Sequence, residues 1–317
     1  MKKLFIMLAA AATVVSCAKE QTIVADQGEA IEFGNVFVDN ATRANDPSYS
    51  ANDITAFKVY GTVNNVNILD GDDVKKTANY GEAWSLTEAG TDTPIELYWI
   101  PGADYKFVGI VDGDKEGVTK TNVENKMPLS VEYTADGVTD LLCQTITKTA
   151  KTDGTANGLV AFNFNHLLSK VNFTVKNNST EADGHSFVVK NITFNGATKA
   201  TYDVVNKEWK TASATGDTAL TQIAVASGAA SADLGTEVLF IPGEYSISFT
   251  VDILYNGNVI TSTNYPASPT TYTHTLVAGN AYNFNVAVSV GELIEFTVTK
   301  QPSWADGDGA DDTTLTL

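Results

Sequence analysis

The sequence has little cysteine, little histidine and a single arginine among its 317 residues. The histidines, His166, His185 and His274, are too scattered for a metal site with recognisable spacing, and each is interpreted as a structural residue. No Gly-x-Ser-x-Gly, P-loop or dinucleotide fingerprint occurs, and no nucleophile and base can be paired. The chain carries a formal net charge of −18 and lacks any basic cluster. We therefore expect no enzyme, no metal or other cofactor, and no nucleic-acid partner.

Long apolar runs are also absent, with one exception at the start. After Lys2 and Lys3, the twelve residues from Leu4 to Val15 are apolar apart from Thr13. A membrane-spanning helix needs about 20 such residues, so residues 1–16 are predicted to be a secretory signal peptide. The following Val14-Val15-Ser16-Cys17 resembles the lipobox of bacterial lipoproteins, in which the cysteine becomes the acylated N-terminus. Cys17 is therefore predicted to carry the lipid, including palmitate, and several acyl chains would hold the chain on a membrane.

An acylated Cys17 leaves Cys143 as the only other cysteine, so no intrachain disulfide is expected and a hydrophobic core must hold the exported chain. Cys143 lies in an apolar run and is interpreted as a small buried hydrophobic residue. Convincing long helices are missing, although the Ala-rich stretch 218–234 is predicted to include a short one. Alternating strand patterns dominate instead, most clearly at 282–290, and predict an all-β protein with sandwich-like layers.

One pattern occurs twice and favours two related domains. Leu97 to Gly102 and Val238 to Gly243 are apolar runs that end in Pro-Gly, and each is followed by a strand that begins with Tyr105 or Tyr245. The Gly-, Thr- and Asn-rich stretch 148–158 is the predicted boundary. We expect a lipidated propeptide at 17–43, an N-terminal β-sandwich at 44–157 and a C-terminal β-sandwich at 158–317.

The segment 31–38 is predicted to form a strand, with Ile31, Phe33 and Phe37 on one face. It is followed by a polar loop that contains Arg43 and Ala44. Arg43 is the only arginine in a Lys-biased chain. An arginine in such a loop indicates a trypsin-like processing site, and a plain linker explains it equally well.

Several motifs, in this order and spacing, resemble the fimbrillin family of Bacteroidales, the subunits of type V pili. They are the lipobox at Cys17, the strand 31–38 followed by Thr42-Arg43-Ala44, the stretch Phe162 to Val171, Gly279 to Phe284, and Trp304 to Gly307. The resemblance covers nearly the whole chain and implies two tandem transthyretin-like β-sandwiches.

The resemblance also implies a mode of assembly. A lipoprotein precursor would reach the outer membrane, and a trypsin-like protease would cut between Arg43 and Ala44 and release the strand that carries Ile31, Phe33 and Phe37. A C-terminal strand of another copy or a related subunit would then fill the exposed groove, head to tail, in a cell-surface fimbria that supports adhesion. Two donor candidates fit: one carries Ile294, Phe296 and Val298, and the other carries Leu315 and Leu317.

Two alternatives remain open. Exposed tryptophans on a β-sandwich can bind sugars, so a surface-anchored glycan-binding lipoprotein is the second hypothesis, with Trp84 and Trp209 as possible platforms. The acidic turns Asp70 to Asp73 and Asp306 to Asp312 have a faint calcium-loop character. Neither matches an EF-hand pattern, and acidic turns are the better interpretation.

Overall fold

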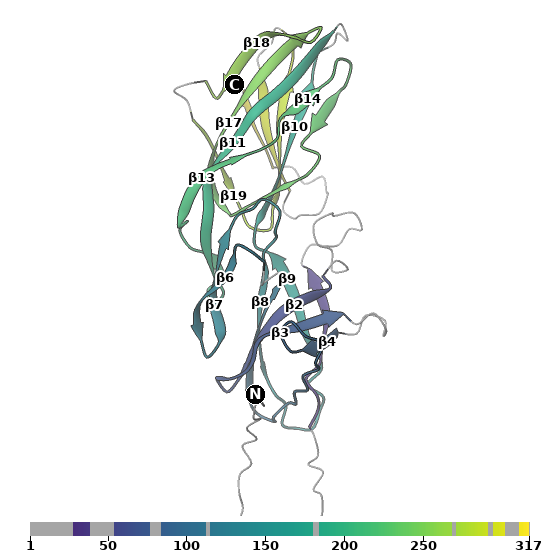
Figure 1. Cartoon of the computed structure of the whole chain (residues 1–317), viewed down its shortest axis with the longest axis vertical. Helices are drawn as coiled ribbons and strands as arrows, with labels where there is room; N and C mark the ends of the chain where they lie inside the picture. Colours follow the sequence, from purple (N-terminus) through teal and green to yellow (C-terminus); the bar gives the residue numbers. More distant parts are fainter. Residues whose placement is uncertain are drawn as a thin grey trace, which may run out of the picture.

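The computed structural model describes residues 28–38, 54–76, 84–111, 115–179, 184–267, 271–290, 294–301 and 311–316. For residues 35, 37–38, 122, 301 and 311–316 it describes the backbone alone. Every regular element in these ranges is a β-strand, which confirms the predicted all-β class. No helix in the described part of the chain is long and apolar enough to cross a membrane. Figure 1 shows an elongated molecule with sheets in a lower and an upper half.

The first sheet has seven strands in the order β1-β9-β8-β5-β2-β3-β4. Neighbouring strands are antiparallel except β1 and β9, which are parallel. The bounds are β1 (Phe33–Val38), β9 (Val160–His166), β8 (Leu142–Thr149), β5 (Asp104–Val111), β2 (Ala56–Val63), β3 (Val66–Lys76) and β4 (Trp84–Thr87). This sheet forms much of the lower half in Figure 1.

The second sheet has nine strands and is built on the long strand β11. Its main path is β18 (Asn258–Tyr265), β17 (Gly243–Tyr255), β11 (His185–Asp203), β7 (Met127–Thr134) and β6 (Val118–Glu124). Four short strands join it: β12 (Glu208–Trp209), β13 (Ala214–Ala219) and β14 (Ile223–Val225) on β11, and β19 (Tyr272–Leu276) on β17.

The third sheet has six strands, with the order β15-β10-β20-β21-β22 and β16 also paired to β10. The bounds are β15 (Ser231–Asp233), β10 (Ser169–Asn177), β20 (Ala281–Val288), β21 (Glu295–Gln301), β22 (Asp311–Thr316) and β16 (Val238–Phe240). The expected short helix in 218–234 is wrong, because this stretch forms β14, β15 and the end of β13. Each of these short strands hydrogen-bonds to a longer strand, and turns such as that at Gly228, with φ +78°, separate them.

The nine- and six-stranded sheets pack face to face as a sandwich. Aromatic rings cross the interface, with centroid distances of 5.7 Å between Phe173 and Phe249 and 5.1 Å between Phe194 and Phe284. Edge-to-face pairs of this kind add to the burial of apolar area that stabilises the core. The alternation noted in the sequence supplies the buried face of this layer. Strand β20, where the alternation is clearest, has no fully exposed residue on its other face either.

The seven-stranded sheet uses both of its faces. On one face Phe57, Phe107 and Phe162 belong to a separate, smaller core, while on the other Tyr60 and Val108 belong to the larger core. The larger core also contains Val131 and Tyr133 of β7, so the β6–β7 hairpin covers the second face. This hairpin belongs to the nine-stranded sheet, which therefore reaches from the upper half into the lower half (Figure 1).

The predicted boundary at 157/158 does not coincide with the division between sheets. Strand β9 follows that boundary, yet it pairs with β8 and β1 in the first sheet. The change of sheet falls at Leu167 and Leu168, between β9 and β10. Residues 148 and 149 of the soft stretch end β8, and the rest lies in the loop that connects β8 to β9, two neighbouring strands of one sheet.

At both copies of the repeated Pro-Gly pattern a buried tyrosine binds back to the main chain before the turn, through different atoms in the two places. The hydroxyl of Tyr105 accepts a hydrogen bond from the Ile100 N–H at 2.8 Å and donates to the Tyr98 carbonyl at 3.2 Å. The hydroxyl of Tyr245 donates to the Ile241 carbonyl at 2.8 Å. In each case a buried tyrosine at the start of a strand fixes the turn that precedes it, which satisfies main-chain groups that would otherwise be buried without partners.

Candidate functional site

The segment 28–38 closes the seven-stranded sheet, because its main chain has partners on both sides. On one side it meets the chain that leads from β4 to β5: the Ile31 N–H donates to the Leu97 carbonyl at 2.8 Å, and the Trp99 N–H donates to the Glu29 carbonyl at 2.9 Å. On the other side the Val160 N–H donates to the Glu32 carbonyl at 2.8 Å, and β1 then runs parallel to β9. Strand β1 also contacts β4, which stands at the opposite end of the strand order. The segment therefore brings the two ends of a curled sheet together.

The side chains of this segment fill an apolar groove. Ile31, Phe33 and Val36 are buried in the smaller core. The Phe33 ring lies 5.6 Å, centroid to centroid, from Phe107 in an edge-to-face contact and 6.4 Å from Phe162 in a stacked one. These side chains pack in a cluster of apolar residues, which an apolar strand matches.

The pattern of buried residues along the segment differs from simple alternation. The register between β1 and β9 shifts between Gly34 and Phe37, which marks a β-bulge. A bulge inserts one residue and moves the following side chains to the opposite face. It explains why Val36, which the sequence pattern did not identify, is buried along with Ile31 and Phe33. The side chain of Phe37, the third predicted residue, lies outside the described atoms.

A polar contact holds the start of the segment to the loop between β8 and β9. The exposed carboxylate of Glu29 accepts hydrogen bonds from the Asn157 backbone N–H at 2.9 and 2.7 Å, from Asn157 Nδ2 at 2.7 Å and from the Gly158 N–H at 3.2 Å. These bonds, the Asn157 backbone N–H first among them, hold the pKa of the Glu29 carboxyl below its ordinary value. We name these contacts of Glu29 with Asn157 and Gly158 the Glu29 clamp.

The loop has its own support on the other side. Lys148 donates to the carbonyls of Gly158 at 3.2 Å and Leu159 at 3.4 Å, and its ammonium lies 5.1 Å from the centroid of the Trp99 ring. Burial lowers the pKa of Lys148, an effect that nearby Glu29 opposes. Sequence reasoning missed the Glu29 clamp, because an acidic residue two positions before a strand has the appearance of an ordinary solvated charge.

The two predicted donor strands occupy different positions in the six-stranded sheet. Strand β21 lies between β20 and β22. Its Phe296 and Val298, and Ile294 directly before it, are buried in the larger core. Strand β22 is the outermost strand and pairs only with β21 among the described strands, with Leu315 opposite Phe296 in the backbone register. Leu317 lies outside the described residues, as do Cys17, Arg43 and Ala44.

The other features that the sequence singled out have structural partners. His166 Nδ1 lies 2.6 Å from an Asp140 carboxylate oxygen in the interior, and the rings of His185 and Tyr255 are 5.0 Å apart. Burial lowers the pKa of His274 and raises that of the Cys143 thiol to about 12. Among the described residues no three His, Cys, Asp or Glu side chains are grouped as metal ligands.

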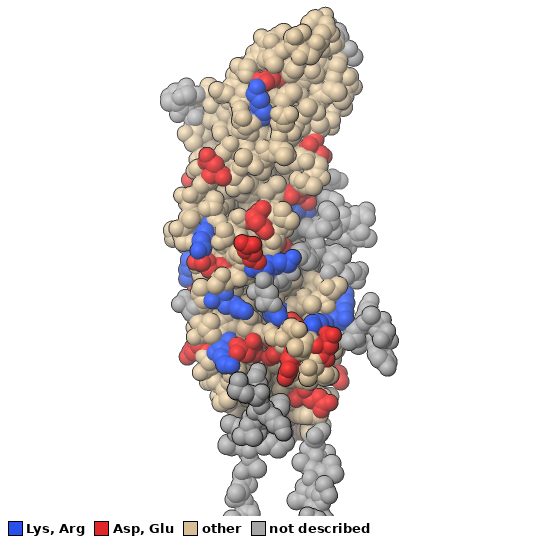
Figure 2. Space-filling model, viewed as in Figure 1, with Lys and Arg blue, Asp and Glu red and all other residues tan. Residues whose placement is uncertain are grey.

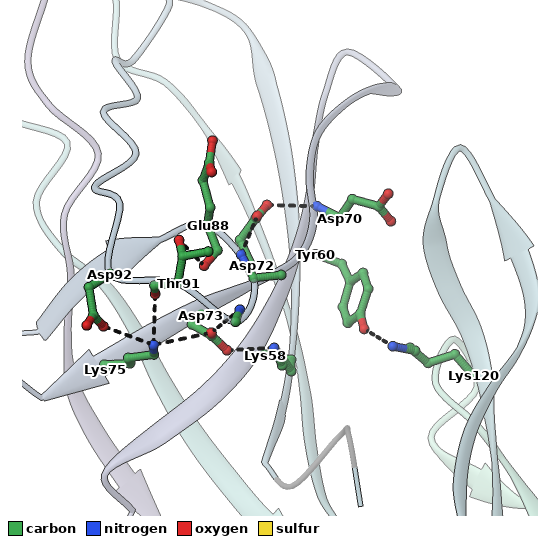
Figure 3. A network of polar contacts seen from close by, with 12 residues as sticks. Lys58, Tyr60, Asp70, Asp72, Asp73, Lys75, Glu88, Thr91, Asp92 and Lys120 are labelled. Carbon is green, nitrogen blue, oxygen red and sulfur yellow. Dashed lines mark hydrogen bonds and ion pairs between the residues drawn. The ribbon is translucent and has the colours of Figure 1, made fainter. Parts of the chain in front are cut away.

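The acidic segment Asp70 to Asp73 lies within strand β3 and takes part in a network of ion pairs and hydrogen bonds (Figure 3). Asp73 binds Lys58 at 2.7 Å and accepts from the Gly90 N–H at 2.9 Å. Burial acts to raise the pKa of Asp73, but these contacts outweigh it and the pKa lies below its ordinary value. Asp70 pairs with Lys126 at 2.7 Å and so links β3 to the β6–β7 hairpin. Protein groups therefore occupy these carboxylates. The expected turn is wrong: the segment is a bulge within β3, where Gly71 has φ +79°.

The described tryptophans do not form an exposed platform for a sugar. Trp99 is buried, and Trp84 and Trp209 are half-buried. The Trp84 ring lies 5.6 Å from Phe57, and Trp209 Nε1 donates to the Leu167 carbonyl at 2.8 Å. Trp304 lies outside the described residues.

Fold and groove together define an all-β protein whose first and last described strands lie at the edges of two different sheets. The sequence profile of the fimbrillin-like family matches residues 42–302. The chain therefore belongs to the fimbrillin-like family, as the sequence motifs indicated. A search of curated proteins returns no match.

Solved structures show the same fold at low sequence identity. A fimbrial protein from Bacteroides vulgatus ATCC 8482 is 12% identical, with a TM-score of 0.57 over 88% of this chain and 100% of that one. A proposed cell adhesion protein from Bacteroides uniformis ATCC 8492 is 19% identical, with a TM-score of 0.51 over 89% of this chain and 99% of that one. At these identities the likeness establishes the fold.

Proposed function

We propose that the chain is a structural subunit of a cell-surface fimbria that assembles by donor-strand exchange and supports adhesion. It would be exported as a lipoprotein acylated at Cys17, anchored in the outer membrane, and cut after Arg43 by a trypsin-like protease. Membership of the fimbrillin-like family supports the fimbrial role. The single observation that carries the mechanism is the segment 28–38, an apolar strand that closes a sheet and precedes the only arginine of the chain.

Cutting the chain does not by itself empty the groove. Burial of a large apolar side chain contributes roughly 1.5–3 kcal/mol, so Ile31, Phe33 and Val36 together hold the cut strand by several kcal/mol. The main-chain hydrogen bonds on both sides add to this. The cut strand therefore stays bound until another strand replaces it, which protects the apolar groove from non-specific association.

The structure favours β22 over β21 as the donated strand. Removing β21 would expose Ile294, Phe296 and Val298 and separate β22 from its only described neighbour. Removing β22 leaves β21 paired to β20 and the core side chains in place. An outermost strand at one end of the molecule and a replaceable strand in the other half make a heterologous contact (Figure 1). Repetition of such a contact produces an open filament.

The uncut, unlipidated precursor tests this proposal. Because Arg43 is the only arginine, an arginine-specific protease has one target, and Arg43→Lys is the matched control that it does not cut. We expect a single cut, retention of the released strand at first, and then slow growth of ladders as the strand leaves. Intact mass, size-exclusion chromatography and unheated gels measure the three steps. A chain that is cut, loses residues 18–43 and remains monomeric contradicts strand exchange.

A further inference from the structure

A long stretch near the C-terminus carries no charged residue. From Ile253 to Gly291 there is no Asp, Glu, Lys or Arg, although the chain has 58 such residues, 20 basic and 38 acidic, in 317. This stretch, which we call the charge-free region, contains β18, β19 and β20. Strand β20 is an internal strand of its sheet, so its lack of charge is explained by burial. That explanation does not apply to β18.

Strands β18 and β19 form the outer edge of the nine-stranded sheet. Both pair with β17, on the side opposite β11, and β18 pairs with no other strand in the described part of the chain. Most of β18 is exposed, and Val259 and Ile260 each keep 54% of their surface in contact with solvent. Tyr255, where β17 ends, is 45% exposed. An edge of this kind presents unpaired main-chain donors and acceptors beside apolar side chains.

Strand β18 has neither the charged residues nor the proline that commonly protect an edge strand. Natural edges carry charged side chains, especially lysine, or proline, or a β-bulge, or are very short. Three other outer strands do carry charge: β6 contains Lys120 and Glu124, β13 contains Asp217, and β22 begins with Asp311 and Asp312. In β18 the only irregularity is a bulge at Ile260, after which residues 261–265 keep a regular register with β17. Pro266 comes after the strand has ended.

Electrostatics favours a second copy of the chain as the partner. The formal net charge is −18, and without Lys2 and Lys3 of the signal peptide it becomes −20, so two copies repel each other over most of their surfaces. Figure 2 shows that charged side chains gather on the lower part of the visible face and are sparse on the upper part. Two acidic copies therefore approach with the least repulsion at an edge that has no charge.

We propose that β18 is a self-association surface at which two copies pair edge to edge, antiparallel, through a twofold axis. Such pairing would join two nine-stranded sheets by main-chain hydrogen bonds, and Val259, Ile260 and Tyr255 would pack beside them. The contact goes beyond the proposed function and does not depend on strand exchange, because it uses a different sheet edge. Between copies in neighbouring filaments, this contact would join the filaments side by side into bundles. The contact is small, so the association is expected to be weak.

Analytical ultracentrifugation of the uncut, unlipidated precursor, residues 18–317, from about 5 to about 500 µM tests the proposal. We expect a monomer–dimer equilibrium that tightens as salt rises from about 20 to about 500 mM, because salt screens the repulsion between acidic copies. Hydrogen exchange provides a second measurement: the amides of β18 should exchange more slowly at the high concentration. The precursor keeps its groove filled, so strand exchange does not contribute to either signal.

The decisive comparison uses one added lysine in two places. Ile260→Lys puts the residue that natural edges use for protection on β18, and it should raise the dissociation constant about tenfold or more. Val66→Lys makes the same charge change at a residue that is 65% exposed on the β2–β3 hairpin of the first sheet, and it should leave the constant unchanged. Both variants reduce the net negative charge equally, so a selective loss identifies the edge. A chain that stays monomeric throughout, or a dimer that Ile260→Lys does not weaken, overturns the proposal.

Discussion

The exposed side chain of Glu29 adds polar contacts to the segment 28–38, whose buried side chains are apolar. Its carboxylate receives four hydrogen bonds from Asn157 and Gly158, in the loop that precedes β9. Ile31 and Phe33, the groove-filling residues, follow immediately. The Glu29 clamp therefore orients the start of the strand, and the apolar side chains fill the groove behind it.

We expect Glu29→Gln to shorten the time for which the cut strand remains bound, several-fold, while the uncut precursor unfolds almost as the wild type does. A neutral amide accepts weaker hydrogen bonds than a carboxylate. The rate at which residues 18–43 leave after arginine-specific cutting, followed by mass spectrometry, measures the effect. Glu32→Gln is the matched control, since Glu32 contributes its main-chain carbonyl to β9. Equal release from both variants would show that the clamp does not hold the strand.

The same clamp predicts a pH dependence. Because the pKa of Glu29 is lowered in the folded chain, its contribution is present above the ordinary pKa of a glutamate and is lost as pH falls through the lowered value. Release of the cut strand should therefore accelerate in the acid range below about pH 4.3 and stay constant near neutrality. In Glu29→Gln this acid-dependent increase should be smaller.

At the scale of the elements, alternation in the sequence predicted a strand at 31–38, and the structure has β1 at Phe33–Val38 with Ile31 and Phe33 both buried. It could not predict the bulge that buries Val36, because a bulge depends on the partner strand. Nor could it show that β1 pairs with β9, which lies more than a hundred residues further along the chain. The short helix expected in 218–234 failed for a related reason: pairing with β11 and β10 overrides the local preference of an Ala-rich stretch.

The two C-terminal strands should respond differently to mutation. Removal of residues 311–317 takes away an outermost strand, so we expect the precursor to fold with little loss of stability but to stop forming ladders after cutting. Phe296→Ala creates a cavity in the larger core and should destabilise the fold by about 3–5 kcal/mol. Urea unfolding and ladder formation measure the two effects. Ladders from the truncated chain would move the donor role to β21.

At the scale of the whole molecule, the repeated Pro-Gly pattern predicted two related units, and the soft loop at 148–158 gave a boundary between them. The sheets follow a different division, because β9 completes the first sheet and the β6–β7 hairpin is part of the second. The larger core takes in Tyr60, Val108 and Ile110 from the first sheet. The sequence alone cannot show that strands of different sheets share one core, because a strand has the same alternating pattern whichever sheet it joins.

We therefore expect the precursor to unfold as one unit. Differential scanning calorimetry should give a single transition with a calorimetric enthalpy close to the van't Hoff value. Phe162→Ala, in the smaller core, should lower the free energy of unfolding by about 3–5 kcal/mol. The whole transition should therefore move to lower temperature. Two separate transitions, only one of them shifted, would indicate two independently folding domains.

The placement of β1 and β22 in opposite halves has a consequence for growth. If every subunit gives a strand from one half and receives one in the other, the two tips of a filament are chemically different. One tip carries a groove that still holds its propeptide or awaits a strand, and the other carries a tail that no subunit has taken up. The filament is then polar. A protein that has only the groove, or only the donor strand, binds at one tip and stops growth there.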